Sequence, residues 1–191
     1  VARSGWSGEA GYEIYLKDKK LGNQLWEIFM DAGKDYKIAP AAPNQICRIE
    51  CGMLSYGSDM TLSENPYDLN FGKFVDLEKK HDFLSKDSLI KINKNGSKKE
   101  LVGIEIIGDP FLDYVGDHLP MYFKERSIGK ITSSVYSPRL KKNIGLALIE
   151  RREKEIKNLM KEAERGVGKN KQNKDLLKNC VWDDPIHDFR N

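Results

Sequence analysis

The stretch RSGWSGEAGYEIYL at residues 3–16 places three glycines ahead of a short run of alternating side chains. Glycines at this density indicate a turn with positive φ angles, or a backbone that another group approaches closely. The run at 11–16 is predicted to be a strand, in which Tyr12, Ile14 and Leu16 share one face. We expect that apolar face to lie in the core.

The other face of this predicted strand carries a carboxylate and a phenol, Glu13 and Tyr15, with Trp6 close by on the turn. A carboxylate beside aromatic rings suits a flat heterocycle with N–H donors, because the carboxylate accepts two hydrogen bonds while the rings stack. The alternative is an edge strand on which Glu13 and Tyr15 are solvated. Periodicity alone favours that alternative.

The stretch resembles the Arg-(Ser/Thr)-Gly-aromatic-(Ser/Thr)-Gly-Glu-x-Gly-aromatic-Glu-Ile block of the folate-dependent aminomethyltransferases, the family typified by the glycine cleavage T-protein. Two further blocks follow in the family's order: RIECGMLSYGSDM at 48–60 with NPYDL at 65–69, and TSSVYSPRLKKNIGLA at 132–147. The resemblance covers residues 1–147 and is strongest to the dimethylsulfoniopropionate demethylase branch.

The resemblance implies that tetrahydrofolate is the cofactor and indicates which residues bind it. In the family, the glutamate at the position of Glu13 binds the pterin ring; Tyr15 would support that contact, and Trp6 would offer an aromatic face to the pterin or to a sulfonium. Tyr56 is implied to line the folate cleft, with a surface-packed tyrosine as the alternative. Asn44 stands where the T-protein pattern has an arginine that contacts folate, so a fixed cation is replaced by a neutral amide.

Asn44 favours the demethylase branch, whose sequences resemble Pro-Asn at this point. The implied activity is a tetrahydrofolate-dependent methyltransferase that moves a methyl group from dimethylsulfoniopropionate, its small-molecule partner, to tetrahydrofolate. Two alternatives stay open: a T-protein-type aminomethyltransferase, and a non-catalytic folate-binding relative such as the iron–sulfur assembly branch. The Lys-Gly-Cys-Tyr-x-Gly-Gln signature of that branch is absent from the sequence. A homodimer is left open as well.

No other chemistry is indicated by the remaining motifs. The three histidines are widely scattered, the three cysteines show no C-x-x-C spacing, and GWSG at 5–8 lacks the last glycine of a nucleophile elbow. We therefore predict no catalytic side chain and no metal ligand in this chain. Methyl transfer from a sulfonium fits this expectation, because it depends mainly on proximity and orientation.

Composition places the chain among globular proteins, with 39% hydrophobic and 32% charged residues. No apolar run approaches the roughly 20 residues that span a bilayer, and no signal-peptide pattern opens the sequence, so we expect a cytoplasmic protein without a membrane partner. The net charge of +3 is concentrated in residues 151–180, which hold ten Lys and Arg against five Asp and Glu. Without interleaved aromatic residues, this segment is predicted to be a solvated insertion and not a nucleic-acid patch.

After the predicted strand at 11–16, hydrophobic periodicity indicates helices first and further strands later in the chain. Helices are expected at 23–32, at 43–54 and at 85–94. In the first of them Trp26 belongs to the apolar stripe, and Gly33 is expected to end it. Strands are expected at 101–107, 127–134 and 143–148.

The resemblance implies an α+β fold, the end of a ferredoxin-like α/β domain followed by a small C-terminal antiparallel β-barrel domain. The predicted domains are the folate-binding part at 1–94, the barrel at 99–150, a basic helical or disordered insertion at 151–180 and a tail at 181–191. Relatives carry a comparable stretch before this sequence begins. We therefore expect the chain to be the C-terminal half of a larger enzyme, and to be inactive when isolated.

Overall fold

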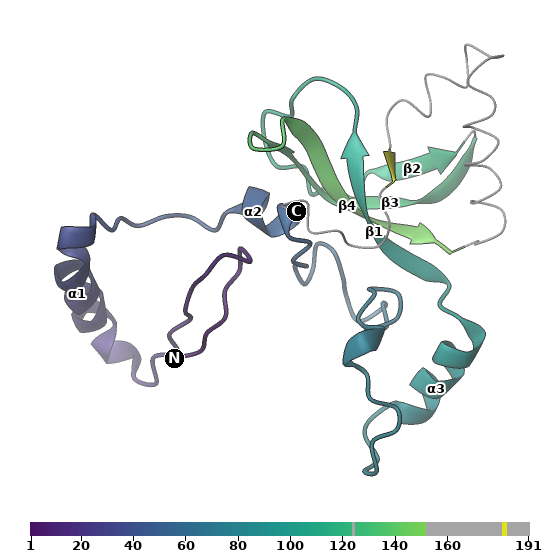
Figure 1. Ribbon diagram of the computed structural model, residues 1–191, viewed down its shortest axis with the longest axis horizontal. Coiled ribbons are helices and arrows are strands. Elements are labelled where there is room, and N and C mark those ends of the chain that lie inside the picture. Colours follow the sequence, from purple (N-terminus) through teal and green to yellow (C-terminus); the bar gives the residue numbers. More distant parts are fainter. Residues whose placement is uncertain (124, 152–180, 183–191) are drawn as a thin grey trace.

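The computed structural model describes residues 1–123, 125–151 and 181–182. An antiparallel sheet forms the main body, and helix α2 lies against it (Figure 1). Helix α1 and the N-terminal loop stand apart from the sheet in the same view. None of the helices in this described part is long and apolar enough to cross a membrane.

The sheet has five strands in the order β2-β3-β4-β1-β5, and all of its pairs are antiparallel. Their bounds are β1 Lys99–Ile106, β2 Pro120–Phe123, β3 Arg126–Ser137, β4 Lys142–Glu150 and β5 Val181–Trp182. The strands predicted at 101–107, 127–134 and 143–148 are confirmed as β1, β3 and β4, whereas β2 and β5 were missed. The α+β class with an antiparallel C-terminal domain is therefore confirmed.

Both faces of the central strands are covered, so their residues read as apolar runs rather than as a simple alternation. On one face Val102, Ile104, Ala147 and Ile149 pack with Met121. On the other face, two clusters join the sheet to residues outside it: Ile144 and Leu146 pack on Ile49, and Leu101 and Leu148 pack on Leu69.

Two glycines allow strands β3 and β4 to approach each other closely. A Cβ on Gly145 would lie 2.8 Å from the carbonyl oxygen of Ser133, and one on Gly129 would lie 2.3 Å from that of Leu148. Gly129 also has a φ of +157°, which few L residues adopt. The close approach of the two strands therefore requires glycine at both positions.

The helices are α1 Gly22–Gly33, α2 Gln45–Glu50 and α3 Lys86–Asn95. The predictions of helices at 23–32 and 85–94 are confirmed, whereas the helix predicted at 43–54 is wrong in length. Asn44 caps the start of α2, and Gly52 adopts a φ of +67° just after its end, so the helix has less than two turns. Helix α1 ends at Gly33 as predicted, but Gly33 is right-handed, and the chain continues into a 3₁₀ turn before it becomes left-handed at Lys37.

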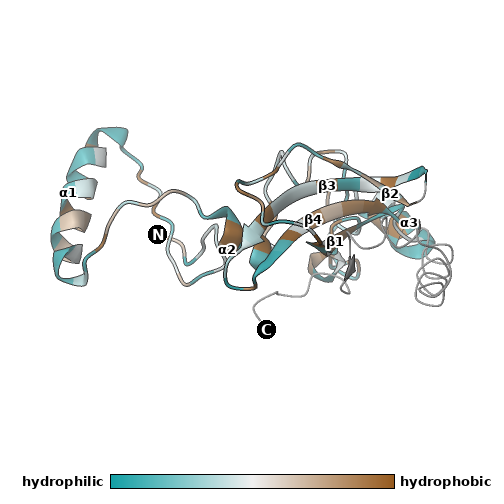
Figure 2. Cartoon of the chain, turned by 90° about the horizontal axis from the view of Figure 1, so that it is seen from above, coloured by the Kyte–Doolittle hydropathy of each residue, from teal (hydrophilic) through white to brown (hydrophobic). Residues whose placement is uncertain are grey.

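The N-terminal predictions of burial are wrong. Residues 11–16 form no strand, only one isolated bridge between Ala2 and Glu13, and Tyr12 is 71% exposed. Ile14 and Leu16 are exposed too, and Trp26 on α1 is 55% exposed. An amphipathic element needs a second layer to bury its apolar face, and none packs on these residues in the described part. Figure 2 shows α1 with no other element beside it.

The predicted basic insertion and tail fall almost entirely outside the described residues. Of them, the structure places Arg151 and the two residues of β5, which pair with Ile104 and Glu105 at the outer edge of β1.

Candidate functional site

Helix α2 carries an arginine that is buried completely. Arg48 is 0% exposed, and its Nε donates to Oε1 of Gln45 at 2.8 Å. Nη1 donates to the carbonyl oxygen of Met53 at 2.8 Å and to Oδ2 of Asp59 at 2.6 Å. Nη2 donates to Oγ of Ser133 on β3 at 3.0 Å. The edge of the guanidinium is thus occupied by partners from helix, loop and sheet.

Asp59 balances the charge of Arg48 and is buried as fully. Its Oδ2 accepts from Arg48 and from the backbone N–H of Ser55 at 2.9 Å. Its Oδ1 accepts from Thr132 at 2.7 Å and from Ser133 at 2.6 Å. Burying an ion pair is costly unless the remaining hydrogen-bonding groups are satisfied, and here they are. In the described residues no buried side-chain nitrogen or oxygen lacks a partner.

A second ion pair joins α2 to the β3–β4 hairpin at a less buried place. Glu50 accepts from Oγ of Ser137 at 2.5 Å, and its other oxygen lies 2.8 Å from Nη2 of Arg139. The side chain of Arg139 is half exposed, whereas that of Glu50 is buried. Helix α2 is therefore fixed to the sheet by two carboxylate–guanidinium pairs and by the packing of Ile49.

The glycine-rich turn at 5–8 rests on the same helix. The ring of Trp6 lies over the Arg48 guanidinium, with 5.5 Å between Cζ and the ring centroid. Sγ of Cys51 lies 3.3 Å from the carbonyl oxygen of Ser7. Of the predicted site residues, Trp6 is thus the one that the structure brings against a buried network.

Glu13 is held by its backbone and not by a strand. It exchanges two backbone hydrogen bonds of 2.9 Å with Ala2, and its carboxylate accepts a hydrogen bond from the Ser4 hydroxyl. The side chain is exposed, and so is that of Tyr15. The two residues follow a turn in which Gly8 has a φ of +73°.

Tyr56 and Asn44 lie elsewhere. Tyr56 is exposed on a turn that the Gly57 N–H and the Met60 carbonyl close at 2.8 Å. Asn44 Oδ1 accepts from the backbone N–H groups of Ile46 at 2.9 Å and Cys47 at 3.2 Å, so this side chain caps α2. Within 1–123 and 125–151, no hydrogen bond, ion pair or ring contact joins Glu13, Tyr15, Tyr56 and Asn44 to one another.

Sequence reasoning missed three features of this site. The cap by Asn44 could have been found, since asparagine ahead of a helical run is a common helix start. Asp59 and Ser133 lie in the second and third recognised blocks, but nothing in their spacing shows that they meet Arg48. The signal available was only the presence of charged and hydroxyl residues inside apolar segments.

A cavity of about 500 Å³ opens where the start of α2 meets the sheet. Aromatic and apolar side chains dominate its lining, which also includes Asn44. The lining residues are Ala42, Pro43, Asn44, Gln45, Ile46, Phe111, Leu112, Asp113, Tyr114, Val135, Tyr136 and Pro138. A cavity of this size and lining suits the flat, partly apolar portion of an organic ligand.

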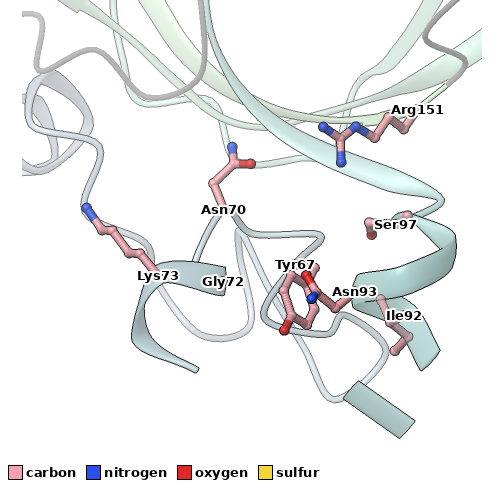
Figure 3. A pocket seen from close by; sticks show the side chains of 9 residues that line it. Tyr67, Asn70, Gly72, Lys73, Ile92, Asn93, Ser97 and Arg151 are labelled. Carbon is pink, nitrogen blue, oxygen red and sulfur yellow. The ribbon is translucent and has the colours of Figure 1, made fainter. Parts of the chain in front are cut away.

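A second cavity, of about 410 Å³, lies between the loop at 67–73 and the C-terminal end of α3 (Figure 3). Three of its polar side chains already have partners. Asn70 donates to the carbonyl oxygen of Leu101 at 2.7 Å, the Ser97 hydroxyl donates to Asp68, and Arg151 pairs with Glu100 at 3.4 Å. We therefore place the candidate site at the turn and cavity beside α2.

Two family models match the chain. The model of the GCVT N-terminal domain matches residues 1–79, and that of the glycine cleavage T-protein C-terminal barrel domain matches residues 99–173. The domain bounds predicted from the sequence, 1–94 and 99–150, stay a prediction.

Curated relatives include proteins with two different names. A dimethylsulfoniopropionate demethylase of Ruegeria pomeroyi is 35% identical over 151 residues, which are 79% of this chain and 40% of the relative. An aminomethyltransferase of Caldanaerobacter subterraneus is 37% identical over 160 residues, which are 83% of this chain and 41% of the relative. The chain thus spans about two fifths of the length of the relatives it matches.

A solved structure has the same fold. The glycine cleavage system aminomethyltransferase T from Bartonella henselae superposes with a TM-score of 0.66 at 21% identity, over 78% of this chain and 40% of that one. The model of the N-terminal domain matches the earlier part of the chain, and the model of the barrel domain matches the later part. Over the residues that the two models match, the chain belongs to the glycine cleavage T-protein family.

Proposed function

We propose that this chain supplies part of the folate site of a tetrahydrofolate-dependent methyltransferase, which moves a methyl group from dimethylsulfoniopropionate to tetrahydrofolate. The observation that carries the proposal is the opening block at residues 3–16. There, an exposed carboxylate on Glu13 follows a glycine turn in which Trp6 lies over Arg48. A carboxylate in this position is able to accept two N–H donors from one edge of a pterin ring.

Trp6 and Tyr15 are proposed to take part in the same ligand contact. Each offers an aromatic ring near Glu13 in sequence, and Trp6 is 38% exposed, so part of its ring is open to a ligand. A sulfonium that meets an indole face gains about 0.5–2 kcal/mol. Asn44 and Tyr56 are proposed as outer contacts to the folate, with Asn44 acting from the lining of the 500 Å³ cavity.

The reaction requires the protein mainly to position the two reactants. The methyl carbon leaves the sulfonium sulfur, which keeps the electron pair of the broken bond and becomes a neutral thioether. The carbon bonds to N5 of tetrahydrofolate, and the proton on N5 is released. Because the substrate carries its own leaving group, orientation of the two reactants accounts for the rate, and no side chain needs to act as a nucleophile.

The second candidate function is aminomethyl transfer of the T-protein type. It is favoured by the aminomethyltransferase relatives, which are as similar to this chain as the demethylase is. Asn44 opposes it, because the arginine of the T-protein pattern is absent. Dependence of turnover on a lipoyl carrier protein would separate the two functions.

We propose in addition that the site needs residues equivalent to the part of the relatives that this chain does not span. Residues 1–40 contain no buried residue, and α1 leaves Trp26 and Phe29 exposed. Exposing this apolar surface to water is unfavourable, and exposed apolar patches mark surfaces that bind another protein segment. The isolated chain is therefore proposed to be inactive, and the complete enzyme to work in the cytoplasm.

The test is tetrahydrofolate binding, measured by calorimetry on this chain joined to the N-terminal part of the demethylase relative. Glu13→Gln is expected to weaken binding about tenfold or more, the effect of losing one charged hydrogen bond. Glu27→Gln removes the same charge from the exposed helix α1 and serves as the matched control. Equal affinity of the Glu13 variant and the parent would show that Glu13 is only a solvated residue.

Turnover then tests the donor. The fused protein is expected to form dimethylsulfoniopropionate-derived thioether and 5-methyltetrahydrofolate in equal amounts without a lipoyl carrier. Turnover that appears only with an aminomethylated lipoyl carrier would replace the demethylase proposal by the second candidate.

A further inference from the structure

The guanidinium of Arg48 has two kinds of partner. Its nitrogens donate hydrogen bonds to Gln45, Met53, Asp59 and Ser133. Its central carbon, Cζ, lies over the ring of Trp6. A lysine has no planar group of this kind and could not satisfy both sets of partners at once.

The contacts that attach the glycine turn to α2 come from one side of that helix. Arg48 and Cys51 are three positions apart and therefore lie on the same face. Arg48 contacts the ring of Trp6, and Sγ of Cys51 lies near the carbonyl oxygen of Ser7. The position of the turn is thus set by residues 48–51 and by what holds them.

Helix α2 is held in turn by hydroxyl groups of β3. Thr132 and Ser133 both donate to Oδ1 of Asp59, and the Thr132 oxygen also lies 3.1 Å from the carbonyl oxygen of Leu146 on β4. Any shift of β3 relative to β4 would therefore be transmitted to Asp59 and from there to Arg48.

The same network reaches the 500 Å³ cavity through Tyr114. Its hydroxyl lies 3.1 Å from Oγ of Ser133. Ser133 gives its single proton to Asp59 and accepts from Arg48, so the Tyr114 hydroxyl must be the donor in this contact. Tyr114 lines the cavity, so the cavity wall and the Trp6 ring are bound to one buried ion pair.

We propose that Arg48 is a positioning residue: paired with Asp59, it fixes the Trp6 turn relative to the barrel, so that the turn and the Tyr114 side of the cavity form one rigid unit. The connection between the Trp6 turn and the barrel is inferred from the contacts alone. Only the statement that this unit orients folate rests on the proposed function.

Arg139 provides a matched control. It also joins α2 to the sheet by a guanidinium–carboxylate pair, with Glu50, but no described contact joins it to Trp6. If Arg48 merely anchors α2, loss of either arginine should affect the turn alike. If Arg48 positions Trp6, only its own loss should do so.

The first experiment uses this chain alone and needs no folate. Trp26 and Trp182 are replaced by phenylalanine, so that acrylamide quenching reports on Trp6 only. In Arg48→Met, the population with a detached turn is expected to rise about 2- to 30-fold, the factor that corresponds to a lost cation–π contact. Trp6 quenching should increase accordingly, and it should stay at the parent level in Arg139→Met.

Arg48→Met leaves Asp59 buried without its partner and could unfold, so a second set of variants keeps the test decisive. Amide exchange of residues 2–13 is compared in the parent, Trp6→Phe and Trp6→Leu. Since phenylalanine keeps a cation–π face and leucine does not, exchange should rise in the order parent, Trp6→Phe, Trp6→Leu, while β3 stays unchanged. Equal exchange in all three proteins, or equal quenching in Arg48→Met and Arg139→Met, would overturn the proposal.

Tetrahydrofolate affinity of the fused protein then tests the orienting role. Trp6→Leu and Arg48→Met are expected to weaken binding, whereas Arg139→Met is not. If quenching and exchange respond as expected but no variant, nor the parent, binds tetrahydrofolate, the proposed function fails and the positioning of the turn stands. If the parent binds and the turn does not respond, the positioning fails alone.

Discussion

Residues 1–40 and residues 99–150 contain similar apolar side chains, yet only the second range contains buried ones. In the strands, Leu101, Ile104 and Ile144 are almost fully enclosed, whereas Trp26 and Phe29 on α1 are exposed. The difference lies in layers: both faces of β1 and β4 are covered, while α1 has no described layer beside it. An amphipathic element has an apolar face, but that face becomes buried only when a second element packs against it.

The same contrast holds for charges. Lys34 and Asp31 form a 3.0 Å ion pair on the helical side, with both side chains largely in water. Arg48 and Asp59 form a 2.6 Å pair with both side chains fully buried. Solvent screens the first pair, so its net contribution is small, whereas removing one partner of the second leaves a bare charge in the interior.

The largest effect is expected from breaking the buried pair. Asp59→Ala leaves Arg48 without its counter-ion and should lower the free energy of unfolding by about 3–5 kcal/mol. Urea unfolding followed by far-ultraviolet circular dichroism measures this. Asp31→Asn is the control on the exposed pair and should change stability by less than about 0.5 kcal/mol. Similar losses in both variants would abolish the contrast between the two regions.

A smaller loss is expected where the strands approach each other. In Gly129→Ala the new methyl group meets the backbone of Leu148 and Ile149, and the positive φ is unfavourable as well, so stability should fall by about 3 kcal/mol. Gly5→Ala in the N-terminal turn has no heavy atom within 4 Å of the new Cβ. Its thermal unfolding should match that of the parent, and a large loss there would mean that the turn is more tightly packed than described.

Glu64 gives a pH-dependent effect at the start of the second region, where it pairs with Lys99 at 3.0 Å. Burial pushes the pKa of its carboxyl up, but hydrogen bonds from Lys99 and Thr61, together with the Lys99 charge, outweigh burial and hold the pKa below its ordinary value. The folded state therefore favours the ionised carboxyl. Its contribution to stability is present above the unfolded pKa and is lost as the pH falls through the lowered folded pKa.

Glu64→Gln should accordingly cost roughly 1 kcal/mol at neutral pH. Its stability should also fall less steeply than the parent's as the pH drops through that carboxyl range, as measured by urea unfolding at a series of pH values. Lys99→Met should give a similar flattening, since it removes the main partner. A parallel decline in parent and Glu64→Gln would show that the pair contributes nothing.

The smallest effect is expected on α1. Phe29→Ser replaces an exposed apolar side chain, so the free energy of unfolding should change by less than about 0.5 kcal/mol. Ile104→Ala, a truncation of similar kind in the core, should cost about 2–5 kcal/mol. When the chain is joined to the N-terminal part of the demethylase relative, Phe29→Ser should become clearly destabilising, which sharpens the comparison further.

Local patterns in the sequence predicted the regular elements well and their burial poorly. The strands that became β1, β3 and β4 are marked by β-branched runs, and α1 and α3 by helical periodicity, so their positions were predictable. The burial of Tyr12 and Trp26 was wrong, because periodicity shows which face is apolar but not whether anything covers it. Helix α2 was predicted too long, because the Asn44 cap and the positive φ of Gly52 limit the helix to a shorter stretch than the periodic pattern suggests.

The candidate site was predictable only as a set of residue identities. The opening block pointed to Glu13, Tyr15 and Trp6, and resemblance to a family carried that interpretation. The pairing of Arg48 with Asp59 and Ser133 joins positions far apart along the chain, and no single-sequence pattern encodes such a meeting. In the sequence, Thr132 and Ser133 do not differ from ordinary strand residues; only the structure shows that both donate to Asp59.

The separation of these partners along the chain has a consequence for the lifetime of the folded state. The β3–β4 hairpin joins neighbouring segments, whereas Arg48 and Ser133 are 85 positions apart, and Thr132 and Asp59 are 73 apart. Local pairings form early and distant ones late, so the buried ion pair should be absent from the folding transition state. In stopped-flow experiments, Asp59→Ala should then leave the refolding rate nearly unchanged and accelerate unfolding. The ion pair would therefore mainly slow unfolding, and it would determine how long the turn and the barrel stay assembled.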